Sequence, residues 1–273
     1  MSRFEKLIGI ALLCLFTTSG FADANVEKLQ AAANGDHREQ KNIDRNKSRH
    51  PVETLNFFGI RDDMTVVEMF PGGGGWYTEV LAPYLRDSGK LYAASFNSES
   101  EVGYFRKNSK KYLDKLAANP GVYDQVVVFE YEQGVKPDLQ PAGQADMVVT
   151  FRNTHNWINN DVARETFEAM YKVLKPGGVL GLVQHRGNPS MTGKEWAKKG
   201  YVSEAMVIEL ATKAGFTLAG RSEINGNSRD MKNYEKGVWT LPPVYREGDK
   251  DRERYTTIGE SDRMTLKFMK PSS

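Results

Sequence analysis

The chain has 273 residues, of which 40% are hydrophobic and 26% are charged. This composition suits one globular domain with a sizeable core and excludes a disordered or fibrous protein. Because 37 Lys and Arg nearly balance 35 Asp and Glu, for a formal net charge of +2, no long-range field favours a nucleic-acid partner or an anionic membrane surface.

The first 24 residues differ from the rest of the chain. Two basic residues precede an apolar run over residues 8–20, and Ala22 and Ala24 offer a small-residue cleavage site. This pattern predicts a signal peptide over residues 1–24, and hence a periplasmic or secreted protein. The apolar run is shorter than the about 20 residues that span a bilayer, so no stable membrane anchor is expected after cleavage. Cys14, the only cysteine, lies in the removed segment, so the mature chain has no disulfide.

The next segment, residues 25–50, is polar and mixed in charge, with few apolar residues. We expect it to form an N-terminal arm or lid. The pattern changes at Pro51, which occupies the tolerated first position of a short helix over residues 51–60. The main domain is therefore expected over residues 51–273.

Short apolar strands alternate with helical segments through the main domain. The first five strands are predicted over residues 65–70, 89–96, 125–130, 145–151 and 179–185, and two more over 216–224 and 263–271. The intervening helices are predicted over residues 76–85, interrupted by Pro83, over 98–121, after a cap at Asp161, and over 204–216 with Ser203 as the cap. Such alternation predicts an α/β fold with a mostly parallel sheet covered on both faces. Residues 225–261 form a long excursion, and excursions of this length are often functional.

The stretch VVEMFPGGGGWYTE, residues 66–79, places four glycines between the first strand and the next helix. Ligands bind at this edge of an α/β sheet, and glycines there let the backbone approach a ligand whose carboxylate or phosphate meets free N–H groups. The alternative is a tight turn in which the glycines serve sterics alone. The third glycine of the dinucleotide fingerprint is missing, and no second dinucleotide half follows, so a nicotinamide reductase is disfavoured.

VVEMFPGGGG resembles the first motif of class I S-adenosylmethionine (SAM)-dependent methyltransferases, and VLKPGGVLGLV resembles the helix, turn and fifth strand of the same superfamily. The resemblance covers residues 55–220 and 264–269, and extends to an exported, predicted-methyltransferase subgroup that carries RHPVETLNFFGI and GVWTLPP-like segments. It implies a Rossmann-like seven-stranded sheet, mostly parallel with an antiparallel last strand, helices on both faces, and SAM as cofactor.

The resemblance also implies positions for the cofactor. The residues expected to bind it are Glu68, Phe70, Pro71, Gly72, Gly74, Tyr77, Ser95, Asn97 and Glu130. Ser95 or Asn97 would face the ribose and Glu130 the adenine. Two positions depart from the superfamily, which usually has glycine at Phe70 and an acidic residue at Ser95. Phe70 is expected to narrow the cleft, and losing a charge-assisted hydrogen bond at Ser95 costs about 1.5–3 kcal/mol, or one to two decades of affinity.

TFRNTHNW follows the fourth strand, where this superfamily places groups that face the methyl group. His155 and Asn153 are the expected catalytic residues, because histidine ordinarily titrates near neutrality and can act as a general base. The alternative for His155 is a loop histidine that satisfies a backbone carbonyl or caps the next helix. Phe151 and Trp157 could line an acceptor pocket or belong to the core.

Basic residues elsewhere have open roles. His185 and Arg186 follow the fifth strand and could reach the same cleft or lie in a solvated loop. Arg45, Arg49 and His50 could close over the cofactor carboxylate or be isolated surface charges. The four histidines are scattered and no thiol remains after export, so no metal site is expected. G-x-S-x-G is absent, which excludes the usual serine hydrolase elbow.

These observations favour an enzyme that transfers a methyl group from SAM to a small-molecule acceptor in an exported compartment. Because SAM is made in the cytoplasm, export argues against this chemistry. The alternative is a non-catalytic protein that binds a nucleoside or another small ligand. A cleft blocked by the Phe70 ring would favour the alternative, and Asn97 or Glu99 directed at the ribose would favour the enzyme.

Overall fold

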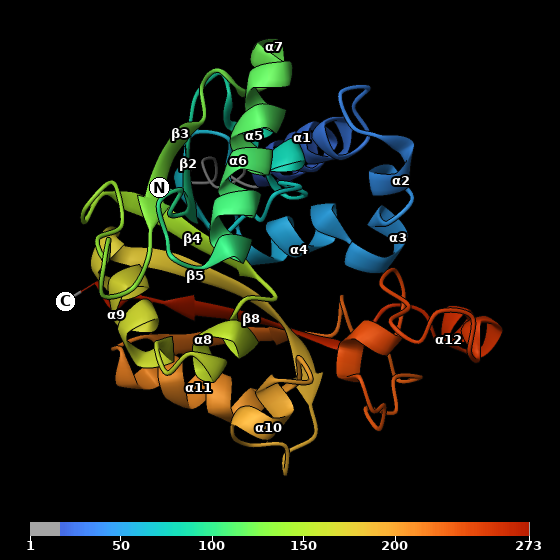
Figure 1. Ribbon diagram of the computed structural model, residues 1–273. Helices are drawn as coiled ribbons and strands as arrows, with labels where there is room; N and C mark the ends of the chain where they lie inside the picture. The colour runs from blue at the N-terminus through green and yellow to red at the C-terminus, as the bar shows by residue number, and fades with distance from the viewer. Residues whose placement is uncertain (1–16, 273) are drawn as a thin grey trace, which may run out of the picture.

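The computed structural model describes residues 17–272, in which eight strands form one mixed sheet (Figure 1). Seven of them follow the spatial order β3-β2-β1-β4-β5-β8-β7, in which only β8 runs antiparallel to the other strands. The strands are β1 (Thr65–Met69), β2 (Lys90–Phe96), β3 (Val127–Tyr131), β4 (Ala145–Phe151), β5 (Leu174–Gly187), β7 (Thr217–Ser222) and β8 (Arg263–Met269). The prediction of a mostly parallel sheet with an antiparallel last strand is confirmed.

Strand boundaries follow the apolar runs closely except at β5. This strand begins at Leu174, five residues before the predicted start, because Leu174 already pairs with Ala145 and a register shift accommodates the residues that follow. The two-residue strand β6 (Val202–Ser203) pairs with the end of β5 and was not predicted.

Helices cover both faces of the sheet, as predicted (Figure 1). One face carries α1 (Thr17–Ala33), α4 (Pro51–Phe58), α5 (Thr78–Leu85), α6 (Gly103–Ala118) and α7 (Pro120–Tyr123). The other carries α8 (Thr154–Asn159), α9 (Ala163–Val173) and α11 (Glu204–Lys213). The shorter helices are α2 (Gln40–Ile43), α3 (Asn46–Arg49), α10 (Lys194–Ala197), the 3₁₀ turn η1 (Gly237–Thr240) and α12 (Arg252–Ile258).

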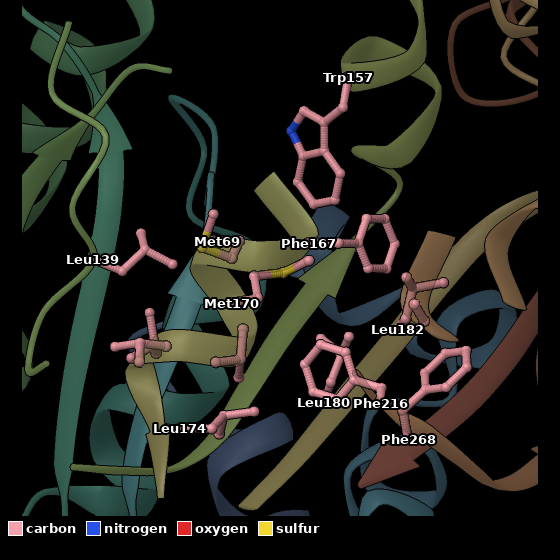
Figure 2. Packing of buried hydrophobic residues seen from close by; sticks show 14 of the residues in the cluster. Met69, Leu139, Trp157, Phe167, Met170, Leu174, Leu180, Leu182, Phe216 and Phe268 are labelled. Carbon is pink, nitrogen blue, oxygen red and sulfur yellow. The ribbon is translucent and has the colours of Figure 1, made fainter. Parts of the chain in front are cut away.

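The larger core lies between the sheet and the α9 and α11 face. Figure 2 shows Phe167 and Met170 of α9 above Leu180 and Leu182 of β5, and all four side chains are completely buried. Burying a side chain of this size stabilises the fold by about 1.5–3 kcal/mol. Because the central strands β1 and β4 are buried on both faces, their residues are mostly apolar without a regular alternation. Polar side chains can face a ligand mainly at the carboxyl ends of these strands.

Helix caps test the local predictions. Ser203 caps α11, because its hydroxyl accepts a hydrogen bond from the Met206 N–H. Asp161 is not a cap: it adopts a left-handed conformation with φ 58°, its side chain pairs with Lys194, and α9 begins two residues later. Pro83 does not end α5, which continues to Leu85.

Residues 25–50 are attached to the core by buried polar contacts. The Arg38 and Glu79 side chains form an ion pair at 3.0 Å, with exposed fractions of 0% and 1%. Glu79 of α5 also accepts hydrogen bonds from Asn42 and Lys115. Leu29 of α1 packs into the same core as α4 and α5. This attachment holds α2 and α3 beside the loop that follows β1.

Residues 1–16, which hold most of the predicted signal peptide, lie outside the described residues. Helix α1 begins at Thr17 and passes through the predicted cleavage site. Among residues 17–272, no helix combines the length and the apolar character needed to cross a membrane.

Candidate active site

The carboxyl ends of three strands meet at one edge of the sheet. Met69, the last residue of β1, pairs with Ala94 of β2 on one side and with Thr150 of β4 on the other. The crossover connections leave β1 in opposite directions at this point, which is the place where ligands bind in open α/β sheets.

Two cavities lie at this edge, and Gly72 lines one of them. The aromatic cavity has a volume of about 430 Å³. Its rings are Phe70, Phe96, Tyr104, Phe105, Tyr131 and Trp157. The polar cavity has a volume of about 440 Å³. Its ionisable and amide groups belong to Glu68, Tyr77, Arg152, Asn153, His155 and His185. Both cavities share the Phe70 ring.

Phe70 occupies the position between the two cavities with a strained backbone. Its φ is +48°, in the left-handed region that favours glycine. The ring stacks on Phe96 with centroids 4.8 Å apart and also contacts Tyr131 and Trp157 at 5.6 and 6.3 Å. The backbone conformation of a glycine is thus kept while an aromatic side chain fills the space between the cavities.

The four glycines differ in how much space surrounds them. An added Cβ at Gly75 would come within 2.9 Å of the buried Tyr112 ring, so packing requires this glycine, and at Gly73 it would come within 2.8 Å of the more adaptable Asn108 side chain. At Gly72 and Gly74 an added Cβ would meet nothing within 4 Å. Gly72, together with Pro71, lines the polar cavity, whereas Gly74 faces a separate cavity beyond the loop. The left-handed backbone at Gly72 (φ +68°) and Gly75 (φ +53°) fits the tight-turn interpretation, whereas the open space beside Gly72 and Gly74 leaves room for a ligand.

Glu68 is a buried carboxyl group at the base of the polar cavity. Its exposed fraction is 2%, and the Thr78 hydroxyl donates a hydrogen bond to its Oε2 at 2.6 Å. No ion pair to Glu68 is found within residues 17–272. Burial raises its pKa to about 7, because desolvation disfavours the charged form. A cation bound in the cavity would supply the missing countercharge.

His155 and His185 lie side by side in the polar cavity, with ring centroids 5.7 Å apart. His155 Nδ1 is 3.4 Å from the Gln184 side-chain oxygen, and burial lowers the pKa of His155 to about 4. His185 Nδ1 lies 2.6 Å from the Ser261 hydroxyl, and burial also lowers the pKa of His185. The expectation that His155 titrates near neutrality is therefore wrong, and both rings are neutral at pH 7.

This assignment predicts the titration of His155. We expect its ring ¹H and ¹³C chemical shifts in NMR spectra to stay constant between pH 8 and pH 5, because the charged imidazolium is poorly solvated at this site. A histidine-containing peptide measured in the same buffer serves as the reference. A His155 midpoint between pH 6 and 7 would contradict the buried, neutral assignment.

Asn153 and Arg152 connect the strands to the cavities. The Asn153 amide donates to the Met69 carbonyl at 3.0 Å and to the Thr150 hydroxyl at 3.2 Å, which ties β1 to β4, and its side chain lines both cavities. Arg152 has φ +65°. Burial lowers the pKa of Arg152 to about 10, with Arg263 the next cause.

Three predicted cofactor residues, Ser95, Asn97 and Glu130, line neither the aromatic nor the polar cavity. Ser95 is 2% exposed within β2. Asn97 is 3% exposed and donates to Glu132 at 2.7 Å, and the Glu130 carboxylate pairs with Lys136. Glu132, two residues further along the chain and just beyond the end of β3, is the acidic residue that lines the aromatic cavity.

Other residues named from the sequence divide between the cavities and the surface. Phe151 lines the polar cavity and Trp157 the aromatic cavity. Arg186 pairs with Asp262 and lies outside both, as does His50. Within residues 17–272, no group of three or more His, Cys, Asp or Glu side chains is arranged to hold a metal ion.

Sequence reasoning missed two residues of the polar cavity. Trp239 and Arg246 come from the excursion over residues 225–261 and line the cavity, with the guanidinium 4.9 Å from the indole centroid. The only sequence signal of a functional role for these two residues was the length of the segment over residues 225–261. The sequence does not show where Trp239 and Arg246 lie, because contacts with residues far away in the chain bring them to the sheet edge.

No protein-family model matches the chain, and no curated protein matches its sequence. Solved structures do match. They include a SAM-dependent methyltransferase from Aquifex aeolicus, which is 15% identical, with 90% of this chain and 98% of that chain covered and a TM-score of 0.53. A geranyl diphosphate methyltransferase in complex with SAM is 12% identical over 88% and 94% of the two chains, with a TM-score of 0.56. The [4+2]-cyclase SpnF is 14% identical over 93% and 95%, with a TM-score of 0.57. The chain therefore has the Rossmann-like fold of the class I methyltransferases.

Proposed function

We propose that the protein binds SAM across the aromatic and polar cavities and transfers its methyl group to a small-molecule acceptor. The observation that carries this proposal is the buried Glu68 carboxyl group, which has no countercharge among residues 17–272 and lies beside the open space over Gly72. A buried carboxyl group of this kind is costly unless a cationic ligand compensates it. SAM carries two such positive groups, on its sulfonium and its amine.

The residues of both cavities suit the parts of this cofactor. Aromatic rings such as Tyr131 and Trp157 offer stacking surfaces for adenine, and Glu132 offers hydrogen-bond acceptors. Glu68 would hold a positive group, and Arg152 would hold the carboxylate. When bound, the cofactor supplies an electrophilic methyl group, so the protein mainly has to align the acceptor and exclude water.

The acceptor side of the polar cavity is formed by neutral and aromatic groups. His155 stays uncharged and can accept a hydrogen bond or a proton, but its low pKa makes it a weak base. It therefore suits orientation of the acceptor better than removal of a proton before transfer. Trp239 and Arg246 complete the wall and offer a ring face and a positive charge.

We expect Arg246→Ala to impair use of the acceptor while leaving SAM binding intact. Losing one charge-assisted contact should raise the KM for the acceptor about tenfold. Arg252→Ala is the matched control, because Arg252 stacks on Tyr245 at 4.1 Å in the same excursion but lies outside the polar cavity. Equal kinetics in the two variants would remove Arg246 from the acceptor site.

Methyl transfer itself is tested with methyl-labelled SAM. The mature chain, residues 25–273, is incubated with the labelled cofactor and fractionated small metabolites, and both labelled product and S-adenosylhomocysteine are measured. We expect equal amounts of the two in at least one fraction, and a reduced yield with Glu68→Gln. If SAM binds but no fraction is ever labelled, the proposal of an enzyme fails.

We further propose that residues 1–24 are a cleaved signal peptide, that residues 25–50 form an arm on the main domain at 51–273, and that the protein works in the periplasm or outside the cell. The N-terminal charge and hydropathy pattern supports export. Asn25, the first residue after the proposed cut, still contacts Ile60 and Tyr84. Edman sequencing of the protein from the periplasmic fraction should begin at Asn25. Recovery of the intact chain in the cytoplasm would contradict export and would remove the problem of SAM supply.

The alternative function is a non-catalytic protein that binds a nucleoside or another small ligand. The Phe70 ring between the cavities favours it, and so does the absence of a carboxylate at Ser95. The Asn97 amide donates a hydrogen bond to Glu132, and the Glu99 side chain is 85% exposed to solvent. Neither side chain is therefore directed at a ribose in the cleft. Saturable nucleoside binding without any SAM binding would favour this function over methyl transfer.

A further inference from the structure

A third cavity, here called the basic cavity, lies beyond the glycine loop. It has a volume of about 540 Å³ and is bounded by α2, α3, the loop and α6. It shares Pro71, Trp76 and Arg152 with the polar cavity, and Gly74 opens into it. Its positively charged groups belong to Lys41, Arg45, Arg49, Lys111, Lys115 and Arg152. Glu39 and Asp114 are the acidic groups of the same wall.

Arg49 is buried in this wall without adequate partners. Its exposed fraction is 4%, and its Nε and Nη1 have no hydrogen-bond partner among residues 17–272. The Glu260 carboxylate lies 3.8 Å from Nε, too far for a hydrogen bond. The guanidinium carbon lies 4.5 Å from the Trp76 ring centroid. Burial and the nearby Arg152 lower the pKa of Arg49.

The surrounding charges do not balance. Arg45, at 2.7 Å, and Arg263 also pair with Glu260, so one carboxylate serves several guanidinium groups. These guanidinium groups lower the pKa of Glu260 to about 2, against the opposing effect of burial. Buried like charges are unfavourable without a counterion. A negatively charged ligand would stabilise this arrangement.

The lysines of the wall differ in their pairing. Lys41 pairs with Glu39, and Lys115 pairs with Glu79. Lys111 has no ion pair within 4 Å among the described residues. It therefore adds another positive charge to the side of the cavity formed by α6.

We propose that the basic cavity binds a doubly charged oxyanion of the phosphate-monoester class, carried by the acceptor. Guanidinium groups offer paired N–H donors that match phosphate oxygens, and an excess of several positive charges favours a dianion over a single carboxylate. Gly74 lets such a group approach the backbone. Because the wall containing Arg152 is shared, the rest of the ligand can extend into the polar cavity. The assignment of the anion to the acceptor rests on the proposed function; the anion site itself does not.

The first test uses inorganic phosphate as the probe. The mature chain is titrated calorimetrically with phosphate and with acetate at constant ionic strength, with and without saturating SAM. We expect phosphate to bind at least tenfold more tightly than acetate and to bind alongside SAM, no more than threefold more weakly because both anions lie near Arg152. Equal affinity for both anions would overturn the proposal. Competition between phosphate and SAM would also overturn it, because the site would then belong to the cofactor carboxylate.

These measurements separate the two proposals of this protein's function. Phosphate binding without any SAM binding would leave the anion site in place and remove methyl transfer. SAM binding without phosphate binding would remove the anion site and leave the proposal of methyl transfer in place.

Variants locate the bound phosphate. Arg49→Met should raise the Tm in the absence of phosphate, because it removes an unpaired buried charge, and should abolish the rise in Tm that phosphate produces. A lowered Tm would show that Arg49 serves the ion pair with Glu260 instead, and would contradict the proposal. Lys111→Gln should weaken phosphate binding at least threefold, and Lys107→Gln, whose lysine is exposed on the same helix outside the cavity wall, should not. Equal effects of the two lysine variants would also count against the site.

Discussion

Glu68→Gln is expected to bind SAM 10- to 100-fold more weakly than the wild type and yet to be more stable above pH 7. The weaker binding follows from losing a buried charge-assisted interaction, worth about 1.5–3 kcal/mol, with a cationic ligand. The greater stability follows from the pKa of Glu68, which burial raises from 4.5 to about 7.

The direction of the stability effect follows from proton binding. Between pH 4.5 and about 7 the folded state keeps a proton on Glu68 that the unfolded state has released, so the free energy of unfolding falls as the pH rises through this range. The full cost, about 3 kcal/mol, is present above pH 7. Glutamine has no charge to bury and avoids this cost at high pH.

Two measurements check the prediction. Urea unfolding at pH 4 and pH 8 should show similar stabilities for both proteins at pH 4 and a more stable variant at pH 8. Calorimetry should show that wild-type affinity for SAM falls below pH 7, whereas the affinity of the variant is independent of pH. A variant that is less stable at pH 8 would mean that Glu68 is a structural group. Unchanged affinity for SAM would mean that Glu68 does not contact the cofactor.

Phe70→Gly is expected to tighten SAM binding by one to two decades. The Phe70 ring belongs to the wall that the aromatic and polar cavities share, and we expect a ligand that spans both to displace it from Phe96, Tyr131 and Trp157. Each aromatic pair contributes about 0.5–1.5 kcal/mol beyond burial. Glycine has no ring, so a ligand does not have to break these aromatic contacts, and glycine also adopts the left-handed backbone at φ +48° without strain.

Phe105→Ala is the matched control for Phe70→Gly. Phe105 stacks on Phe96 with centroids 4.7 Å apart, but it lines only the aromatic cavity. Its removal takes away a ring of the same kind without joining the cavities, so it should weaken binding. If Phe70→Gly also weakens binding, the Phe70 ring packs against the ligand and does not obstruct it.

The sequence predicts the sheet well because its signals are local. Continuous apolar runs mark β1 and β4, and the glycine loop marks the carboxyl edge of β1. Ser203 is recognisable as a cap because a serine before a helix satisfies one of its free N–H groups. Asp161 carries the same signal, but its contact with Lys194 and its left-handed backbone place the helix start later.

The candidate site is predictable only where a residue is adjacent to a strand end. Glu68 near the end of β1, Gly72 after β1 and Asn153 after β4 follow from these places in the chain. Trp239 belongs to a distant excursion, and the low pKa of His155 depends on burial by several elements. Neither feature has a local sequence signal, since each arises from tertiary packing.

Calorimetric titration of residues 25–273 with SAM and S-adenosylhomocysteine, with NAD as the control ligand, tests whether the protein binds this cofactor. We expect saturable micromolar binding of the two sulfur compounds, no binding of NAD, and tighter binding by Phe70→Gly. Absence of heat at millimolar SAM, in both the wild type and Phe70→Gly, would contradict this expectation and leave the fold without the cofactor proposed for it.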